Sequence, residues 1–251
     1  MSTTSDGGNK VPIYRHDGPT GPIKMASYEC RYLEDIERHI AKHIGEPGDV
    51  LHEILSPTVH VDIHVIKPSE KIPYLTLVTS GMSDLDMSVP EEVEPIEEYQ
   101  LAEMIAFLPP EWPESSFKGI RGGGTDDPPG WYPAHWLKYY ARMVHDYKTC
   151  LSWFHTSANG NPASPITDGT EMVGFLMAPP LQLGRDGLLV PTCDGRRIRL
   201  LNLVPILPDE VVYAVNQGGS ALCDKLDGAE NFIFNPARKS ALKRKNFLGL
   251  F

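Results

Sequence analysis

The sequence has few cysteines and no long apolar segment. Its four cysteines, Cys30, Cys150, Cys193 and Cys223, are dispersed, and no two form a Cys-x-x-Cys pair. A zinc ribbon or a redox pair is therefore not indicated, and we expect no metal or other cofactor. No apolar run approaches the roughly 20 residues that a membrane span needs, and no signal peptide is recognisable. The predicted location is a reducing cytoplasm, without membrane contact.

Basic residues are also in short supply. Lys and Arg number 23 against 33 Asp and Glu, which gives a net charge of −10. Such a surface repels phosphate, so general nucleic-acid binding is excluded, whereas a basic protein partner is favoured. The glycine-rich run Gly119–Gly130 is not a phosphate cradle, because no Lys-Ser/Thr follows it and Asp126 and Asp127 would repel phosphate. We interpret it as a mobile loop.

The stretch Val59–Pro90 predicts two adjacent strands and a turn-rich exit. Alternation along Val59–Ile66 places valines and isoleucine on one face, typical of a core. The other face carries His60, Asp62 and His64 and should meet solvent or a site. A second strand, Tyr74–Ser80, ends at Gly81, where we expect a backbone that excludes a Cβ or a close backbone approach.

Four sequence blocks resemble the Suppressor of fused domain family, in its bacterial form. They are LVTSGMSDLDM at Leu77–Met87, AEMIAFLPPEW at Ala102–Trp112, WLKYYARMVHDYKTCLSWFHT at Trp136–Thr156, and LLNLVPILPDEV at Leu200–Val211. The resemblance implies an α+β fold with a mixed, mainly antiparallel sheet and helices packed against it. It also decides Ala102–Leu108 in favour of a strand over a helix.

The resemblance implies a non-catalytic role. Animal members of the family bind and sequester zinc-finger transcription factors, and many bacterial members are proposed immunity proteins against polymorphic toxins. We therefore expect no enzyme but a module that masks a protein partner, with a basic toxin domain as the candidate. The domain is expected over residues 28–219, between a flexible N-terminal segment, 1–27, and a basic C-terminal tail, 220–251.

Two groups of residues are candidates for partner binding. The first surrounds the central strands, and the second lies in the acidic stretch Pro90–Glu103, which contains no Lys or Arg. As a bland alternative, that stretch is a solvated loop. The candidate residues are His60, Asp62, His64, Asp84 and His155 in the first group, and Glu91, Glu92 and Glu94 in the second.

The rival hypothesis is a metal-dependent hydrolase. His60, Asp62 and His64 alternate on one strand and could converge on one ion, with His155 completing the set. Ser83 with a histidine and an aspartate is a weaker alternative, since GMSDL lacks the second glycine of a nucleophile elbow.

Leu33, Ile36, Ile40 and Ile44 recur at helical spacing and predict a helix that ends at Gly45, and further helices are predicted to start at Pro133 and at Pro208. His39 and His43 are four residues apart on the first of these helices, where a solvated surface pair is favoured over a metal site.

Overall fold

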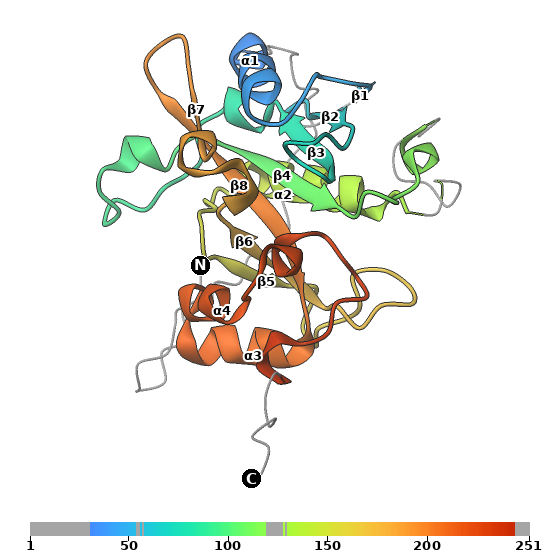
Figure 1. Ribbon diagram of the computed structural model, residues 1–251. Helices are drawn as coiled ribbons and strands as arrows, with labels where there is room; N and C mark the ends of the chain where they lie inside the picture. The colour runs from blue at the N-terminus through green and yellow to red at the C-terminus, as the bar shows by residue number, and fades with distance from the viewer. Residues whose placement is uncertain (1–30, 54–55, 57, 119–127, 129, 244–251) are drawn as a thin grey trace.

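The computed structural model describes residues 31–53, 56, 58–118, 128 and 130–243 (Figure 1). The predicted flexible segment 1–27 and most of the predicted mobile loop at 119–130 lie outside the described residues. Within the described part, no helix is long and apolar enough to span a membrane.

One eight-stranded sheet forms the centre of the structure, in the order β1-β2-β3-β4-β8-β6-β5, with β7 also paired to β8. Neighbouring strands run antiparallel except β4 and β8, which are parallel. The predicted mixed, mainly antiparallel sheet is thus confirmed. The strands are β1 Val50–Leu51, β2 Asp62–Ile66, β3 Leu75–Ser80, β4 Ala102–Leu108, β5 Thr156–Ala158, β6 Gly174–Ala178, β7 Leu189–Pro191 and β8 Arg197–Ile206.

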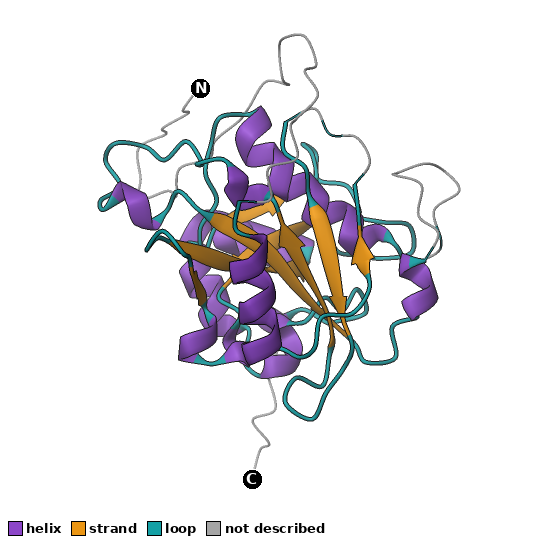
Figure 2. Cartoon of the chain, turned by 90° about the horizontal axis from the view of Figure 1, so that it is seen from above, coloured by secondary structure: helices purple, strands orange, loops and turns teal. Residues whose placement is uncertain are grey.

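Among the described residues, four α-helices pack around this sheet, and Figure 2 shows helices lying across it. They are α1 Leu33–His43, α2 Tyr132–Asp146, α3 Pro208–Gln217 and α4 Gly219–Lys225. The first three agree with the predicted helices. Short 3₁₀ helices include η1 Met82–Asp84, η2 Ile96–Glu98 and η5 Arg185–Gly187.

Helices cover both faces of the central strands. Val61, directly before β2, and Ile63 of β2 pack in one cluster with α2, while Ile66 packs in a second with α1. Every residue of β2, β3 and β4 is buried, because each face of these strands meets a helix. Of the two expected surroundings for the polar row, solvent or a site, solvent is wrong for Asp62 and His64, which are 3% and 1% exposed.

The predicted solvated pair His39 and His43 is also buried. Both rings lie on the face of α1 that packs near η5, with centroids 4.4 Å apart. His39 Nε2 lies 3.1 Å from the carbonyl oxygen of Gly187, so it is the proton-bearing nitrogen that donates. The apolar stripe of α1 is wider than its four regularly spaced hydrophobic residues suggest.

Proline 205 lies inside β8, a strand with neighbours on both sides. The pairing with β4 ends at Ile105 and Asn202, so Pro205 faces only β6. This is the edge-like position at which a strand tolerates proline. The carbonyl oxygen of Pro205 accepts a hydrogen bond from Arg238 Nη2 at 2.9 Å instead.

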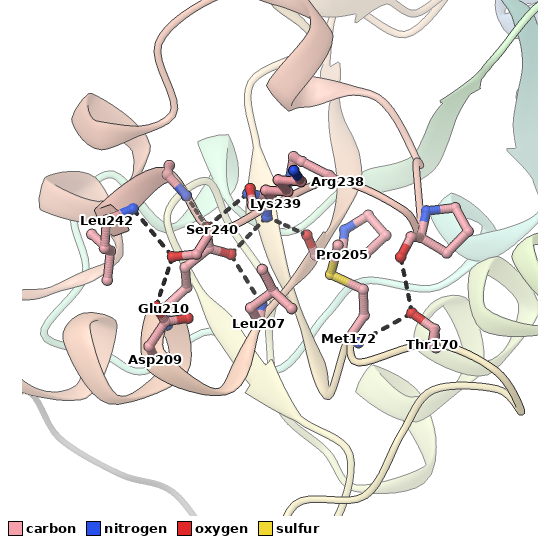
Figure 3. Close-up of polar contacts among 12 residues, drawn as sticks. Thr170, Met172, Pro205, Leu207, Asp209, Glu210, Arg238, Lys239, Ser240 and Leu242 are labelled. Atoms are coloured by element: carbon pink, nitrogen blue, oxygen red, sulfur yellow. Dashed lines mark hydrogen bonds and ion pairs between the residues drawn. The ribbon is translucent and has the colours of Figure 1, made fainter. Parts of the chain in front are cut away.

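Much of the segment expected as a basic tail packs on the sheet. Helix α4 contributes Leu222 to a cluster with α3 and β6, and Phe234 is fully buried. Arg238, 5% exposed, contacts both carboxylate oxygens of the buried Glu210, at 2.7 and 2.6 Å (Figure 3). The folded unit thus continues past residue 219 to at least residue 242, and Arg238 pairs with Glu210 of α3.

Candidate functional site

The motif at Thr79–Asp84 is built around a buried glutamate. Glu103, fully buried on β4, accepts hydrogen bonds from the backbone N–H groups of Gly81 and Ser83 at 3.0 and 2.9 Å. The hydroxyls of Ser83 and Thr79 also donate to it, both at 2.6 Å. Burial raises the pKa of Glu103, while the hydrogen bonds from Ser83 and Thr79 oppose this shift. Glu103 therefore fixes the exit of β3 and is not part of the exposed acidic surface.

Gly81 adopts the conformation that the sequence predicts. Its φ is +110°, and a Cβ built there would lie 1.9 Å from the carbonyl oxygen of His60. Both a left-handed backbone and a close backbone approach thus require glycine.

Asp62 holds the segment that follows β1. Its carboxylate accepts hydrogen bonds from His52 Nδ1 and from the backbone N–H of Glu53, both at 2.8 Å. His60 Nε2 lies 3.4 Å from the same carboxylate. The side chain of Glu53 in turn contacts Arg142 of α2. Asp62 is thus an internal acceptor that connects β1, β2 and α2.

The strand residues adjoin a small cleft beside α1. His60, Ser80, Gly81 and Asp84 line it on the sheet side, opposite Tyr32, Leu33 and Ile36. Asp84 accepts a hydrogen bond from the backbone N–H of Arg31 at 3.0 Å. His64, beneath the cleft, is 3.0 Å from Ser80 Oγ through its Nε2, and burial lowers its pKa. His60 and Asp84 are therefore the two predicted residues that the cleft brings together.

The structure does not assemble the residues of the hydrolase hypothesis. His155 precedes β5, which is separated from β2 by β3, β4, β8 and β6. Among the described residues, no group of three or more His, Cys, Asp or Glu is placed to hold a metal ion. The Ser83 hydroxyl donates to Glu103, so it lacks the histidine base that a serine nucleophile needs.

The acidic stretch forms a projecting loop, residues 86–100, which we call the acidic loop (Figure 1). Arginines at the start of β8 tie down its base. Arg196 pairs with Asp86 and hydrogen-bonds Gln100, and Arg197 pairs with Glu98. Arg199 donates to the carbonyl oxygen of Glu98 at 3.1 Å.

The carboxylates at the tip of the acidic loop differ from those at its base, which pair with arginines. Glu91, Glu92, Glu94 and Glu97 are exposed. In the described part of the chain none of these four carboxylates has a hydrogen bond or an ion pair. The loop therefore presents four unneutralised carboxylates from a base that the arginines hold in place.

Sequence reasoning missed the supporting residues. Glu103 looks like the last member of an acidic run, yet it lies on a strand whose neighbours are all apolar, and that context was the available signal. Arg197 and Arg199 of β8 alternate with hydrophobic residues in the sequence. Their partner, Glu98, is about 100 residues away in the chain. No local pattern identifies pairs at that separation.

The comparisons with known proteins agree with this architecture. The family model of the Suppressor of fused protein (SUFU) matches residues 57–239. No curated protein matches the chain by sequence.

Solved structures of the same type are similar in fold at low sequence identity. The crystal structure of the Sufu–Fu complex matches with a TM-score of 0.59 and 16% identity, covering 84% of this chain and 91% of that one. A protein from Neisseria gonorrhoeae FA 1090, described as a SUFU homologue, matches with a TM-score of 0.56 and 16% identity, covering 84% of this chain and 96% of that one. Drosophila Suppressor of Fused matches with a TM-score of 0.54 and 16% identity, covering 88% of this chain and 53% of that one. With its family model covering most of the sequence, the chain belongs to the Suppressor of fused family.

Proposed function

We propose that this protein is a non-catalytic binding module that masks a basic protein partner, which it attracts through the acidic loop. The observation that carries the proposal is the contrast within that loop. The acids at its base are paired with Arg196 and Arg197, whereas Glu91, Glu92, Glu94 and Glu97 at its tip are exposed. Because its base is held, the loop loses less conformational freedom on binding, and the field of the tip carboxylates accelerates encounter with a basic surface.

Family membership supports a binding role. One similar structure is that of a complex between Sufu and Fu, so a protein of this fold accommodates a protein partner. The described residues also offer no group that could hold a metal ion, and Ser83 donates to Glu103 and not to a histidine, which removes the specific support for the hydrolase hypothesis.

The partner that we propose is a basic toxin domain, encountered in the cytoplasm, which makes the chain an immunity protein. The net charge of −10 and the charged tip complement such a domain. Binding over the active surface of a toxin would suppress its activity without any chemistry by the module itself.

The test begins with capture of partners from cells that encode this chain. The purified partner is then titrated with wild type and with a variant that carries Glu91→Gln, Glu92→Gln and Glu94→Gln. A matched control carries Glu46→Gln, Glu70→Gln and Glu171→Gln, which removes the same charge from exposed positions elsewhere.

We expect the loop variant to associate at least about tenfold more slowly at low salt, and the control to associate like wild type. Physiological salt should shrink this difference, because screening shortens the reach of charge to about 8 Å. An association rate that is equal in the two variants would contradict the proposal that the acidic loop attracts the partner. Growth rescue on co-expression with a toxic partner tests the immunity role.

A further inference from the structure

Beside the acidic loop, an arginine is enclosed between two aromatic rings. The Cζ atom of Arg199 lies 4.6 Å from the ring centroid of Tyr99 and 4.3 Å from that of Trp153. Arg199 is only 8% exposed, and its Nε has no hydrogen-bond partner in the described part of the chain. Its guanidinium stacks on both rings and also donates through Nη2 to the carbonyl oxygen of Glu98, so it holds the two rings in place.

The backbone fixes the second ring from another direction. Trp153 Nε1 donates to the carbonyl oxygen of Leu200 at 2.9 Å. Leu200 lies between the part of β8 that pairs with β7 and the part that pairs with β6. The indole thus fills a gap in the ladder, while its half-buried ring remains partly accessible.

The next residue carries an exposed ring on a strained backbone. Phe154 has φ +71° and is 38% exposed. Its N–H donates to the carbonyl oxygen of Met177 at 2.7 Å, and its own carbonyl lies so close to Gly219 that a Cβ there would approach it to 1.8 Å. A left-handed backbone is unfavourable for phenylalanine, and residues held in this way concentrate at functional sites.

We propose that Tyr99, Trp153 and Phe154 form an aromatic anchor for an apolar side chain of the same basic partner. This inference rests on the proposed function and specifies its partner further. Tyr99 belongs to the acidic loop, so a segment whose lysines or arginines meet the loop brings its neighbouring residues to the rings. Phe154 is exposed and the other two rings are half-buried, and rigid, accessible aromatic side chains are enriched among the residues that dominate binding energy at interfaces.

The recognised segment is therefore one in which basic residues alternate with aliphatic ones. The cations are attracted by the loop carboxylates, and the aliphatic side chains lie against Phe154 and Trp153. A segment of equal charge with small polar side chains would satisfy the loop but not the anchor.

The experiment uses the full chain and two synthetic peptides of equal length and charge, one alternating Lys with Leu and the other Lys with Ser. Calorimetric titrations compare wild type with Phe154→Asn, which removes the ring and places a residue that tolerates positive φ. Val212→Asn is the matched control, since Val212 is 59% exposed on α3. Thermal unfolding of each variant accompanies the titrations.

We expect Phe154→Asn to bind the Lys–Leu peptide at least about fivefold more weakly, to bind the Lys–Ser peptide like wild type, and to melt no lower than wild type. Equal affinity of Phe154→Asn and wild type for the Lys–Leu peptide would overturn the anchor. The triple glutamine variant of the acidic loop should bind both peptides more weakly. Unchanged affinity of that variant for both peptides would overturn the proposed role of the acidic loop. Failure of the aromatic anchor and failure of the acidic loop are therefore seen in different variants.

Discussion

Ser83 gives both its backbone N–H and its hydroxyl to a single carboxylate oxygen of Glu103, at 2.9 and 2.6 Å. The two residues are 20 positions apart and meet because the 3₁₀ turn after β3 lies against β4. The hydrogen bonds of Ser83, in the block Leu77–Met87, are thus accepted by Glu103, in the block Ala102–Trp112.

Replacing Glu103 should destabilise the fold. Glu103→Ala leaves the buried donors of Gly81 and Ser83 without their acceptor and removes the shorter of the two hydrogen bonds that Thr79 donates, so we expect the free energy of unfolding to fall by about 3 kcal/mol. Urea unfolding measures the change, with Glu97→Ala as the control at an exposed position of the acidic loop. A Glu103→Ala midpoint within experimental error of wild type would show that the turn does not depend on this carboxylate.

His39 should make stability depend on pH. Burial lowers its pKa from 6.5 to about 4; the Gly187 carbonyl opposes this shift, and the nearby His43 and Lys42 add to it. The unfolded chain then binds the proton more readily, so the contribution of His39 to stability is complete above pH 6.5 and is lost as the pH falls toward 4.

This loss amounts to about 3 kcal/mol at 1.36 kcal/mol per pH unit. His39→Gln keeps a donor for Gly187 and removes the titration, so its unfolding free energy should fall less steeply between pH 6.5 and 4 than that of wild type. His52→Gln, at a ring 70% exposed, is the control. Parallel curves for wild type and His39→Gln would refute the assignment.

The buried ion pair of Arg238 and Glu210 should stabilise the C-terminal segment. Arg238→Met leaves the Glu210 carboxylate buried without its cation, which should cost about 3–5 kcal/mol. Chemical denaturation measures this cost, and Lys225→Met provides an exposed control. In the double variant with Glu210→Gln the loss should be smaller than the sum of the single losses; simple additivity would mean that the contact is not energetically coupled.

Gly81 and Asp62 should both prove structural. Gly81→Val combines positive φ with a clash against His60 and should lower the free energy of unfolding by about 3 kcal/mol or more.

Asp62→Ala leaves the Glu53 N–H without its acceptor and should lower the free energy of unfolding by about 1–3 kcal/mol. Thermal melting compares them. A wild-type melting temperature for Asp62→Ala would return Asp62 to the role of a binding residue.

Arg199 should restrain the acidic loop. Arg199→Leu removes the hydrogen bond to the Glu98 carbonyl and the stack on Tyr99, so backbone amides near residues 96–100 should exchange hydrogen faster. Hydrogen-exchange mass spectrometry gives this readout, with Arg185→Leu as the control in the turn before β7. Unchanged exchange in the loop would show that Arg196 and Arg197 suffice.

The sequence by itself determined the elements and the fold family. Strand alternation identified β2, helical spacing identified α1, Pro133 and Pro208 marked the starts of α2 and α3, and Gly81 marked a turn that only glycine permits. These signals are local, because the periods of strands and helices and the φ preference of glycine act over a few residues.

Only the tertiary structure decided which polar residues are buried. Asp62 and His64 were expected to face solvent or a site, but α1 covers that face of the sheet. Glu103 looked like part of an acidic surface, but the turn at Gly81 and Ser83 encloses it. Arg238 looked like part of a basic tail, but Glu210 holds it inside. A carboxylate or guanidinium becomes buried only where distant segments supply its hydrogen bonds, and those partners are set by packing, not by neighbours in the sequence.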